Sequence, residues 1–163
     1  TISTRHSNQG DAVVVSILEK MGCEIIEANN AITLVGPKQL RGISIDMRDS
    51  PDIFMAIAAI ALLADSPTTI TGITHARYKE SDRIATMAQG LKQLGAIIEE
   101  GQGAIRIYPS KLHGGVIDTQ SDHRIAMAFA ILGLKVKDIQ LNDKECVTKS
   151  CPEFFNLLEQ VCR

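Results

Sequence analysis

Apolar residues recur along this chain with two different periods. Two segments carry them at every third or fourth position, as on one face of a helix: Val14, Ile17, Leu18 and Met21 in the first, and Ile84, Met87, Leu91 and Leu94 in the second. Each segment ends at a glycine, Gly22 or Gly95, which suits the left-handed residue that closes many helices. The pattern then changes to alternation in residues 23–28 and 31–36, and again in residues 96–100 and 104–109. This alternation predicts two hairpins, one turning at Asn29-Asn30 and one at Gly101 to Gly103.

The order of these patterns is repeated, which predicts a chain built of similar units. Gly22 corresponds to Gly95 and Asp46 to Asp118, and in both copies a short strand leads to a second helix, in residues 51–64 and 121–134. These second helices are apolar on nearly all sides and must be buried. The predicted unit is helix, three strands, helix and strand, with the apolar helices inside and the sheets around them. The units cover about 9–50 plus 51–80 and 81–120 plus 121–148, and a partial unit covers 149–163.

Composition and charge limit the classes of function. The chain has 163 residues, of which 45% are hydrophobic and 22% charged, as in one globular domain. A formal net charge of -2 and 4% aromatic residues leave little with which to bind a nucleic acid. The longest apolar run, residues 53–64, is too short to span a bilayer, and no leader precedes the first helix. We therefore expect a cytoplasmic protein with neither a membrane nor a nucleic acid as partner.

The spacing of cysteine and histidine predicts neither a disulfide framework nor a metal site. No pair of cysteines has the C-x-x-C spacing, and the four histidines lie far apart in the sequence. We expect reduced thiols. The chain starts at Thr1, within a β-prone stretch, and we expect it to be part of a longer protein.

Charged residues gather at four predicted helix starts. Each of these starts also holds a serine, and Ser50, Ser81 and Ser150 are candidate caps. Free N–H groups and the helix dipole attract anions to such ends. Repeat symmetry would bring the four starts to one end of the molecule, where a pocket for phosphate or carboxylate could be formed by Lys79, Arg83, Arg124 and Lys149.

A purely structural interpretation remains open for most of these charges. Aspartate at a helix start is often only a cap. Lys79, Glu80 and Arg83 can form a solvated set of ion pairs with little energetic weight. Arg124 differs, because it opens an almost wholly apolar helix, where an unpaired guanidinium is costly and requires an anionic partner.

Three neighbouring residues also allow two interpretations. His123 fits packing or hydrogen bonding at a helix start better than it fits ligand binding. His75 and Arg77 lie in the loop that leads to the second unit, where structural and functional interpretations are equally supported.

Three segments, residues 77–96, 121–130 and 146–158, read RYKESDRIATMAQGLKQLGA, SDHRIAMAFA and CVTKSCPEFFNLL. Together they closely resemble the C-terminal part of the 5-enolpyruvylshikimate-3-phosphate (EPSP) synthases, and the resemblance extends along the whole chain. It implies a two-domain enzyme well over twice this length. Each domain would be an inside-out α/β barrel of repeated βαβαββ units, with buried helices and sheets outside. Residues 1–163 would then be most of the C-terminal domain of a monomeric enzyme.

The resemblance also implies a reaction and the residues that perform it. The family moves the carboxyvinyl group of phosphoenolpyruvate to the 5-hydroxyl of shikimate 3-phosphate and releases phosphate, without a metal or cofactor. By motif position, Asp52 would be the base and bind the shikimate hydroxyls, Glu80 would protonate the methylene carbon, and Lys79 would bind shikimate 3-phosphate. Phosphoenolpyruvate would be held by Arg83, Arg124 and Lys149, with His123 in support.

Two physical points bear on these roles. The cations on either side of Glu80, Lys79 and Arg83, should lower its pKa, which disfavours a proton donor unless bound anions offset them. The family's N-terminal motifs, which bind both substrates, are absent from this sequence. The N-terminal domain of the same enzyme is therefore the expected partner, and the chain alone should be inactive.

Two classes of function are compatible with the sequence. The chain is either the catalytic C-terminal half of such a synthase or a non-catalytic binding or assembly module that kept the fold. Charged residues at four separate places favour the first class, because a scaffold has no use for that combination. The catalytic interpretation predicts convergence on one open face of Asp52, Glu80, Arg83, Arg124 and Lys149.

Overall fold

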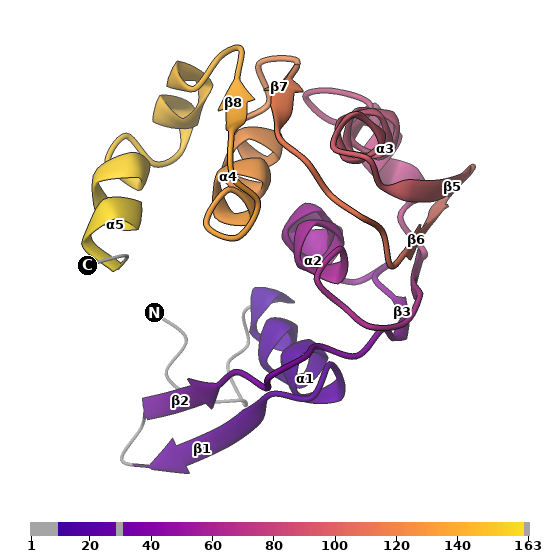
Figure 1. Ribbon diagram of the computed structural model, residues 1–163, viewed down its shortest axis with the longest axis vertical. Coiled ribbons are helices and arrows are strands. Elements are labelled where there is room, and N and C mark those ends of the chain that lie inside the picture. The colour runs from indigo at the N-terminus through magenta and orange to yellow at the C-terminus, as the bar shows by residue number, and fades with distance from the viewer. Residues whose placement is uncertain (1–9, 29–30, 162–163) are drawn as a thin grey trace.

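The computed structural model describes residues 10–28 and 31–161, and Figure 1 shows how they are arranged. The first unit consists of α1 (Val13–Lys20), β1 (Glu24–Ala28), β2 (Ala31–Val35), β3 (Ser44–Asp46), α2 (Phe54–Ala61) and β4 (Thr68–Thr71). The second consists of α3 (Arg83–Gln93), β5 (Ile97–Gly101), β6 (Ala104–Tyr108), β7 (Gly115–Ile117), α4 (His123–Leu132) and β8 (Ile139–Leu141). The helix α5 (Phe154–Val161) follows them. The predicted order of helix, three strands, helix and strand is therefore confirmed in both units.

Short 3-10 turns lead into most of the helices. They are η1 (Gly10–Ala12) before α1, η2 (Pro51–Ile53) before α2, η3 (Thr74–Tyr78) before α3, and η4 (Glu145–Lys149) before α5. None of the helices in the described ranges is long and apolar enough to cross a membrane.

The strands form three separate sheets within the described residues. β1 and β2 form an antiparallel hairpin, as predicted, although its turn at Asn29-Asn30 lies outside the described residues. The second sheet has the order β3-β4-β6-β5, so the last strand of the first unit pairs with the hairpin of the second. β3 and β4 are parallel around α2, as are β7 and β8 around α4. This shared sheet joins the two units.

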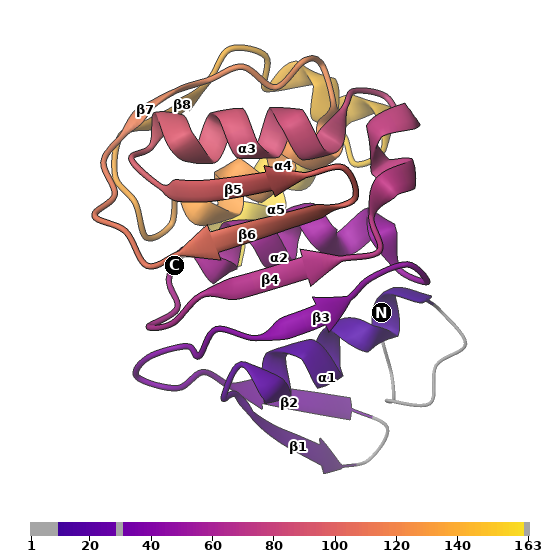
Figure 2. The same cartoon turned by 90° about the vertical axis from the view of Figure 1, so that its right-hand side faces the viewer.

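The second helix of each unit lies inside the molecule. α2 and α4 pack against each other, and four of their large apolar side chains are almost wholly inaccessible to solvent: Phe54, Ile57, Ile125 and Phe129. Each of these side chains contributes roughly 1.5–3 kcal/mol to stability. A Cβ atom on Gly90 of α3 would lie 2.5 Å from Cζ of Phe129, so any other residue there would have to displace this buried ring. Figure 2 shows α3, β5, β6, β4 and β3 on the near side, with α2 and α4 behind them.

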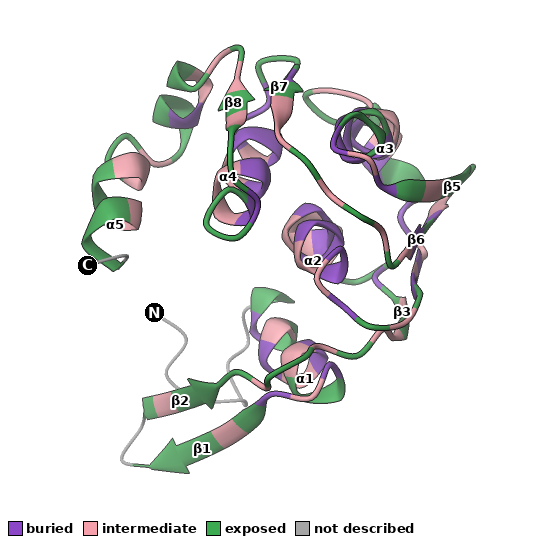
Figure 3. Ribbon diagram, in the orientation of Figure 1, coloured by how far each residue is buried: buried purple, intermediate pink, exposed green. Residues whose placement is uncertain are grey.

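The prediction of buried helices with sheets outside is thus confirmed, but the described strands do not close a barrel. Beyond β8 the described residues form η4 and α5 and add no further strand to these sheets. Figure 3 shows the consequence for burial: α2 and α4 are largely buried, whereas β1, β2 and α5 are exposed or half-buried.

Helix ends follow the sequence predictions in part. Gly22 and Gly95 have φ of 101° and 90°, as predicted for the residues that follow α1 and α3. The prediction that Ser81 caps α3 is wrong, because Asp82 accepts the N–H of Ala85 at 3.0 Å. Ser50 does not cap with its side chain either, since its hydroxyl donates to the carbonyl of Gly10.

The predicted cap of α5 is also wrong, because Ser150 closes η4 and the helix begins later, at Phe154. The hydroxyls of Ser50 and Ser81 make other contacts, with the carbonyl of Gly10 and with Asp122. At the start of α3 the cap is the carboxylate of Asp82, because a charged carboxylate is a stronger acceptor than a hydroxyl.

Candidate functional site

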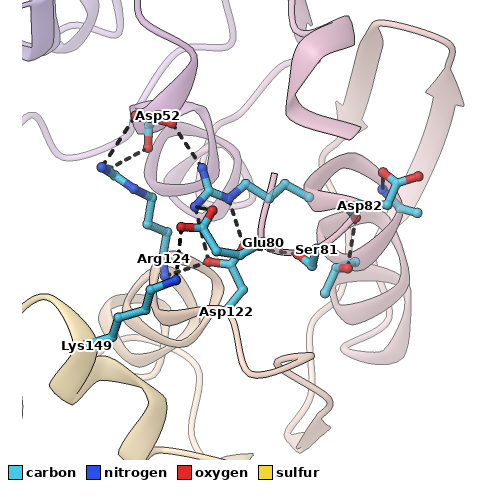
Figure 4. A network of polar contacts seen from close by, with 10 residues as sticks. Asp52, Glu80, Ser81, Asp82, Asp122, Arg124 and Lys149 are labelled. Carbon is cyan, nitrogen blue, oxygen red and sulfur yellow. Dashed lines mark hydrogen bonds and ion pairs between the residues drawn. The ribbon is translucent and has the colours of Figure 1, made fainter. Parts of the chain in front are cut away.

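Four segments far apart in sequence meet in a charged cluster around the side chain of Arg83, the first residue of α3. Figure 4 labels Asp52, Glu80, Asp122, Arg124 and Lys149 in this cluster. Arg83 is only 2% exposed, and all three of its nitrogens contact carboxylates. Its Nε donates to Oδ2 of Asp122 at 2.8 Å, its Nη1 to Oδ1 of Asp52 at 3.0 Å, and its Nη2 to Oε2 of Glu80 at 2.7 Å. One buried cation therefore holds carboxylates from η2, from the connection before α3, and from the start of α4.

Two more cations lie outside this buried centre. Arg124 is 34% exposed, and its Nη2 lies 3.5 Å from Oδ2 of Asp52. Lys149 is 60% exposed, and its Nζ lies 3.3 Å from Oε1 of Glu80. Asp52 and Glu80 thus each bridge Arg83 and an outer cation. With Asp122 on the inner side, the cluster balances three cations against three carboxylates.

Five of the seven site residues predicted from the sequence are brought together here: Asp52, Glu80, Arg83, Arg124 and Lys149. Of the other two, Lys79 is exposed and makes no polar contact with the described residues. His123 is 6% exposed at the start of α4, and its Nδ1 is buried without a hydrogen-bond partner in the described chain.

Arg77 has a structural role. Its guanidinium donates to Asp82 at 2.8 Å and to Glu100 at 2.9 Å, and also to the carbonyls of Gly101 and Gln102. These contacts tie the β5–β6 hairpin to the residue that caps α3. His75 is exposed in η3.

Asp122 is the site residue that sequence analysis missed. It is 0% exposed, it accepts both Arg83 and the N–H of Arg124, and it also accepts the hydroxyl of Ser81 at 3.0 Å. A signal for it exists in the sequence, because an aspartate directly before an apolar, buried helix must itself find a cation. We expected Arg124 to need an oppositely charged partner because it opens an apolar helix. The same reasoning holds more strongly for Asp122, which is 0% exposed whereas Arg124 is 34% exposed.

The surroundings shift the titration of three groups. Burial alone would raise the pKa of Asp122, but the charge and hydrogen bonds of Arg83, with those from Arg124 and Ser81, hold that pKa below its ordinary value. The pKa of Glu80 is lowered by a hydrogen bond from its own N–H and by the charges of Arg83 and Lys149. The predicted direction is confirmed, although Lys149 replaces Lys79 as the second cation. Burial lowers the pKa of His123 and so favours its neutral form.

Acid should destabilise the fold through Asp122. Because its pKa in the folded chain lies below the ordinary value of 3.8, its contribution to stability is complete above that value and is lost as the pH falls through the folded pKa. We expect the urea-unfolding free energy of the parent to fall steeply below about pH 4, and that of Asp122→Asn to fall less over the same range. Equal slopes for the two proteins would contradict this assignment.

Within residues 10–28 and 31–161, no three His, Cys, Asp or Glu side chains are grouped so that they could hold a metal ion. What the cluster offers is carboxylates for proton transfer beside cations that can bind anions.

Comparison with known proteins shows which family this chain resembles. The family model described as EPSP synthase (3-phosphoshikimate 1-carboxyvinyltransferase) matches residues 2–158. A protein of Methanosphaerula palustris named 3-phosphoshikimate 1-carboxyvinyltransferase is 51% identical over 152 residues, which cover 93% of this chain and 36% of the relative. One of Nostoc punctiforme with the same name is 44% identical over 161 residues, covering 96% of this chain and 38% of the relative.

Solved structures agree with this result. An EPSP synthase from Acinetobacter baumannii superimposes with a TM-score of 0.79 at 32% identity, covering 90% of this chain and 38% of that one. The enolpyruvyl transferase NikO from Streptomyces tendae, at 18% identity and a TM-score of 0.69, shows the same fold over 92% of this chain and 35% of that one. The chain spans little more than a third of the length of the curated relatives it matches. Because the family model matches residues 2–158 and the relatives agree in sequence and in structure, the chain belongs to the EPSP synthase family.

Proposed function

We propose that this chain supplies one half of the site at which an EPSP synthase transfers the carboxyvinyl group of phosphoenolpyruvate to shikimate 3-phosphate. The observation that carries the proposal is the convergence of Asp52, Glu80 and three cations from four separate segments. The name 3-phosphoshikimate 1-carboxyvinyltransferase, carried by relatives that match over 93% or more of the chain, supports it.

The outer cations are the groups that an anionic substrate meets first. Arg124 is loosely held, since its nearest carboxylate oxygen is 3.5 Å away, and Lys149 is 60% exposed. A guanidinium with free donors can bind a phosphate or carboxylate through two parallel hydrogen bonds. Arg124 is also the second residue of α4, where the helix dipole adds to the attraction. We assign phosphoenolpyruvate to these two cations.

Arg83 can reach a substrate only by exchanging one carboxylate for another. Asp122 occupies its Nε and is fully buried, but the Asp52 and Glu80 side chains on its two terminal nitrogens are 36% and 33% exposed. If the carboxylate of phosphoenolpyruvate takes the place of Asp52 on Nη1, Arg83 stays paired throughout. Asp52 is then released to accept the proton of the 5-hydroxyl of shikimate 3-phosphate, as a general base.

Glu80 becomes a proton donor through the same exchange. In the chain without substrate its pKa is lowered, with Arg83 and Lys149 among the causes. Substrate anions on those cations offset their charge, which raises the pKa of Glu80 and favours the protonated form needed at the methylene carbon. Lys79 is exposed next to it in sequence and is free to bind the phosphate of shikimate 3-phosphate.

The rest of the enzyme has to complete this half-site. The chain corresponds to 36% of the Methanosphaerula palustris relative, and we infer that the remaining part supplies further anion contacts and covers the cluster. Covering it excludes water and strengthens every charge interaction inside.

The test measures phosphate release from phosphoenolpyruvate and shikimate 3-phosphate. Four samples are compared: this chain, the remainder of the Methanosphaerula palustris relative, a mixture of the two, and a joined enzyme in which this chain replaces the segment it matches. We expect turnover from the joined enzyme, weaker turnover from the mixture, and none from either part. Turnover by this chain alone would contradict the half-site. An inactive joined enzyme that folds would favour the non-catalytic module instead.

A further inference from the structure

The turn between β7 and α4 holds two consecutive residues in a conformation that side chains disfavour. Gln120 has φ of 51° and Ser121 has φ of 52°, and neither is glycine. A residue other than glycine in the left-handed region costs about 1–2 kcal/mol, and such residues persist only where their surroundings hold them. Asp122, His123 and Arg124 follow directly, so this turn determines where three residues of the candidate site begin.

The side chain of Asn142, at the end of β8, holds this turn with both ends of its amide. Its Oδ1 accepts the N–H of Thr119 at 2.9 Å and the hydroxyl of the same residue at 3.1 Å. Its Nδ2 donates to Oδ1 of Asp118 at 2.8 Å. Asp118 in turn accepts the backbone N–H of Gln120 at 3.1 Å and also its side-chain amide. Asn142 therefore contacts the turn just before the two left-handed residues.

From the turn, the contacts continue into the cluster. The N–H of Asp122 donates to the carbonyl of Thr119 at 3.0 Å, so the residue that Asn142 fixes also fixes Asp122. Asp122 then binds Arg83. Asp143, the residue after Asn142, also contacts this turn, because it accepts the hydroxyl of Ser121 at 3.0 Å. It accepts the N–H of Cys146 at 3.2 Å as well. That second contact lies in η4, the turn that ends at Lys149.

The first unit lacks this arrangement. There Asp46 occupies the place of Asp118 and accepts the N–H of Arg48 at 3.0 Å, but no non-glycine residue with positive φ is found between Asp46 and Asp52. The residue that follows β4 is Gly72, which has no side chain to offer. The left-handed pair and the asparagine that holds it occur together, in the unit that carries Asp122 and Arg124.

We propose that Asn142 is a positioning residue of the candidate site: it holds the Thr119–Ser121 turn and thereby directs Asp122 towards Arg83 and Arg124 towards Asp52. Its effect on turnover rests on the proposed function. Because Asn142 acts on α4 and not on Lys79, its loss should weaken the use of phosphoenolpyruvate more than that of shikimate 3-phosphate.

The test compares Asn142→Ala with Gln140→Ala in the joined enzyme. Gln140 is an exposed residue of β8 and serves as the matched control. We expect Asn142→Ala to lower kcat/KM for phosphoenolpyruvate at least tenfold, because small misplacements of binding groups are costly. KM for shikimate 3-phosphate should stay within about twofold of the parent. A kcat/KM for phosphoenolpyruvate close to that of Gln140→Ala would overturn the proposal. A KM that rises equally for the two substrates would overturn it as well.

A second variant covers the case in which Asn142→Ala does not fold. Asn142→Asp keeps the acceptor for Thr119 but places a carboxylate against Asp118, so one shared proton is needed to restore the contact. Its activity relative to the parent should therefore rise as the pH is lowered, and a constant ratio would overturn the proposal.

A readout without turnover separates this proposal from the proposed function. If the parent joined enzyme is inactive, hydrogen exchange at Nε–H of Arg83, followed by NMR in the Asn142 variants, still reports whether Asp122 is in place. Faster exchange in the variants than in the parent supports the positioning role, and unchanged exchange overturns it.

Discussion

Replacing Arg83 by methionine is expected to lower the free energy of unfolding of this chain by about 3–5 kcal/mol. Methionine keeps much of the volume of the side chain but removes the cation that contacts Asp122, which is 0% exposed and has no other cationic side chain on it among the described residues. A buried carboxylate without its partner retains the full cost of desolvation. The change removes less electrostatic stabilisation from Asp52 and Glu80, because about a third of each side chain is exposed to water and each keeps its ion pair with an outer cation. Urea unfolding followed by circular dichroism measures the change.

Two further variants isolate the cause of this loss. The double variant Arg83→Met with Asp122→Leu removes both buried charges and should recover much of the stability, because a buried ion pair can be replaced by apolar groups at little cost. Arg48→Met is the matched control, since Arg48 is 71% exposed and forms an ion pair with the exposed Asp46. If Arg83→Met is no less stable than Arg48→Met, the buried cluster does not stabilise the fold as we infer.

The sequence predicted the parts of the structure that depend on local pattern. Periods of three to four and of two gave the helices and strands, and Gly22 and Gly95 marked helix ends that do require positive φ. The nearly all-apolar segments became the buried helices α2 and α4. The meeting of the charged helix starts followed from the repeat, because equivalent segments occupy equivalent ends of their units.

The contacts of individual side chains could not be predicted in this way. From sequence, Arg83 was placed beside substrate anions, yet in the structure it holds Asp52, Glu80 and Asp122 and is only 2% exposed. A repeat pattern says that two helix starts are near each other. It does not say which of several neighbouring charges will face inward, since this depends on how the helices are rotated and on hydrogen bonds such as that of Ser81 to Asp122.

The left-handed turn was unpredictable for a related reason. Gln120 and Ser121 carry no glycine signature, and their conformation is imposed by contacts from Asp118, Asn142 and Asp143, two of which lie in a later segment. Strain of this kind is set by tertiary structure rather than by local preference. The open barrel, too, depends on which strands are present and not on the pattern within any one unit.

In the joined enzyme, Arg124→Ala is expected to reduce kcat/KM for phosphoenolpyruvate by about 10²–10³-fold, the range found when one well-placed donor to a reacting anion is removed. The same change should affect stability far less than Arg83→Met does. Arg124 is 34% exposed, and its ion pair with Asp52 spans 3.5 Å, so water can replace it on the folded chain. Large loss of turnover with little loss of stability is the signature of a cation kept for a ligand.

A large loss of stability with little loss of turnover would instead give Arg124 a structural role only, as the partner of Asp52 at the start of α4. Arg124→Lys refines the choice, because lysine keeps the charge but cannot form two parallel hydrogen bonds, so a binding role predicts partial recovery at best. Arg48→Ala, which removes an exposed arginine from the first unit, controls for the change in net charge. Phosphate release at varied phosphoenolpyruvate separates kcat from KM. Near-parental kcat/KM in Arg124→Ala would withdraw Arg124 from the proposed site and leave Lys149 as the outer cation that meets the substrate.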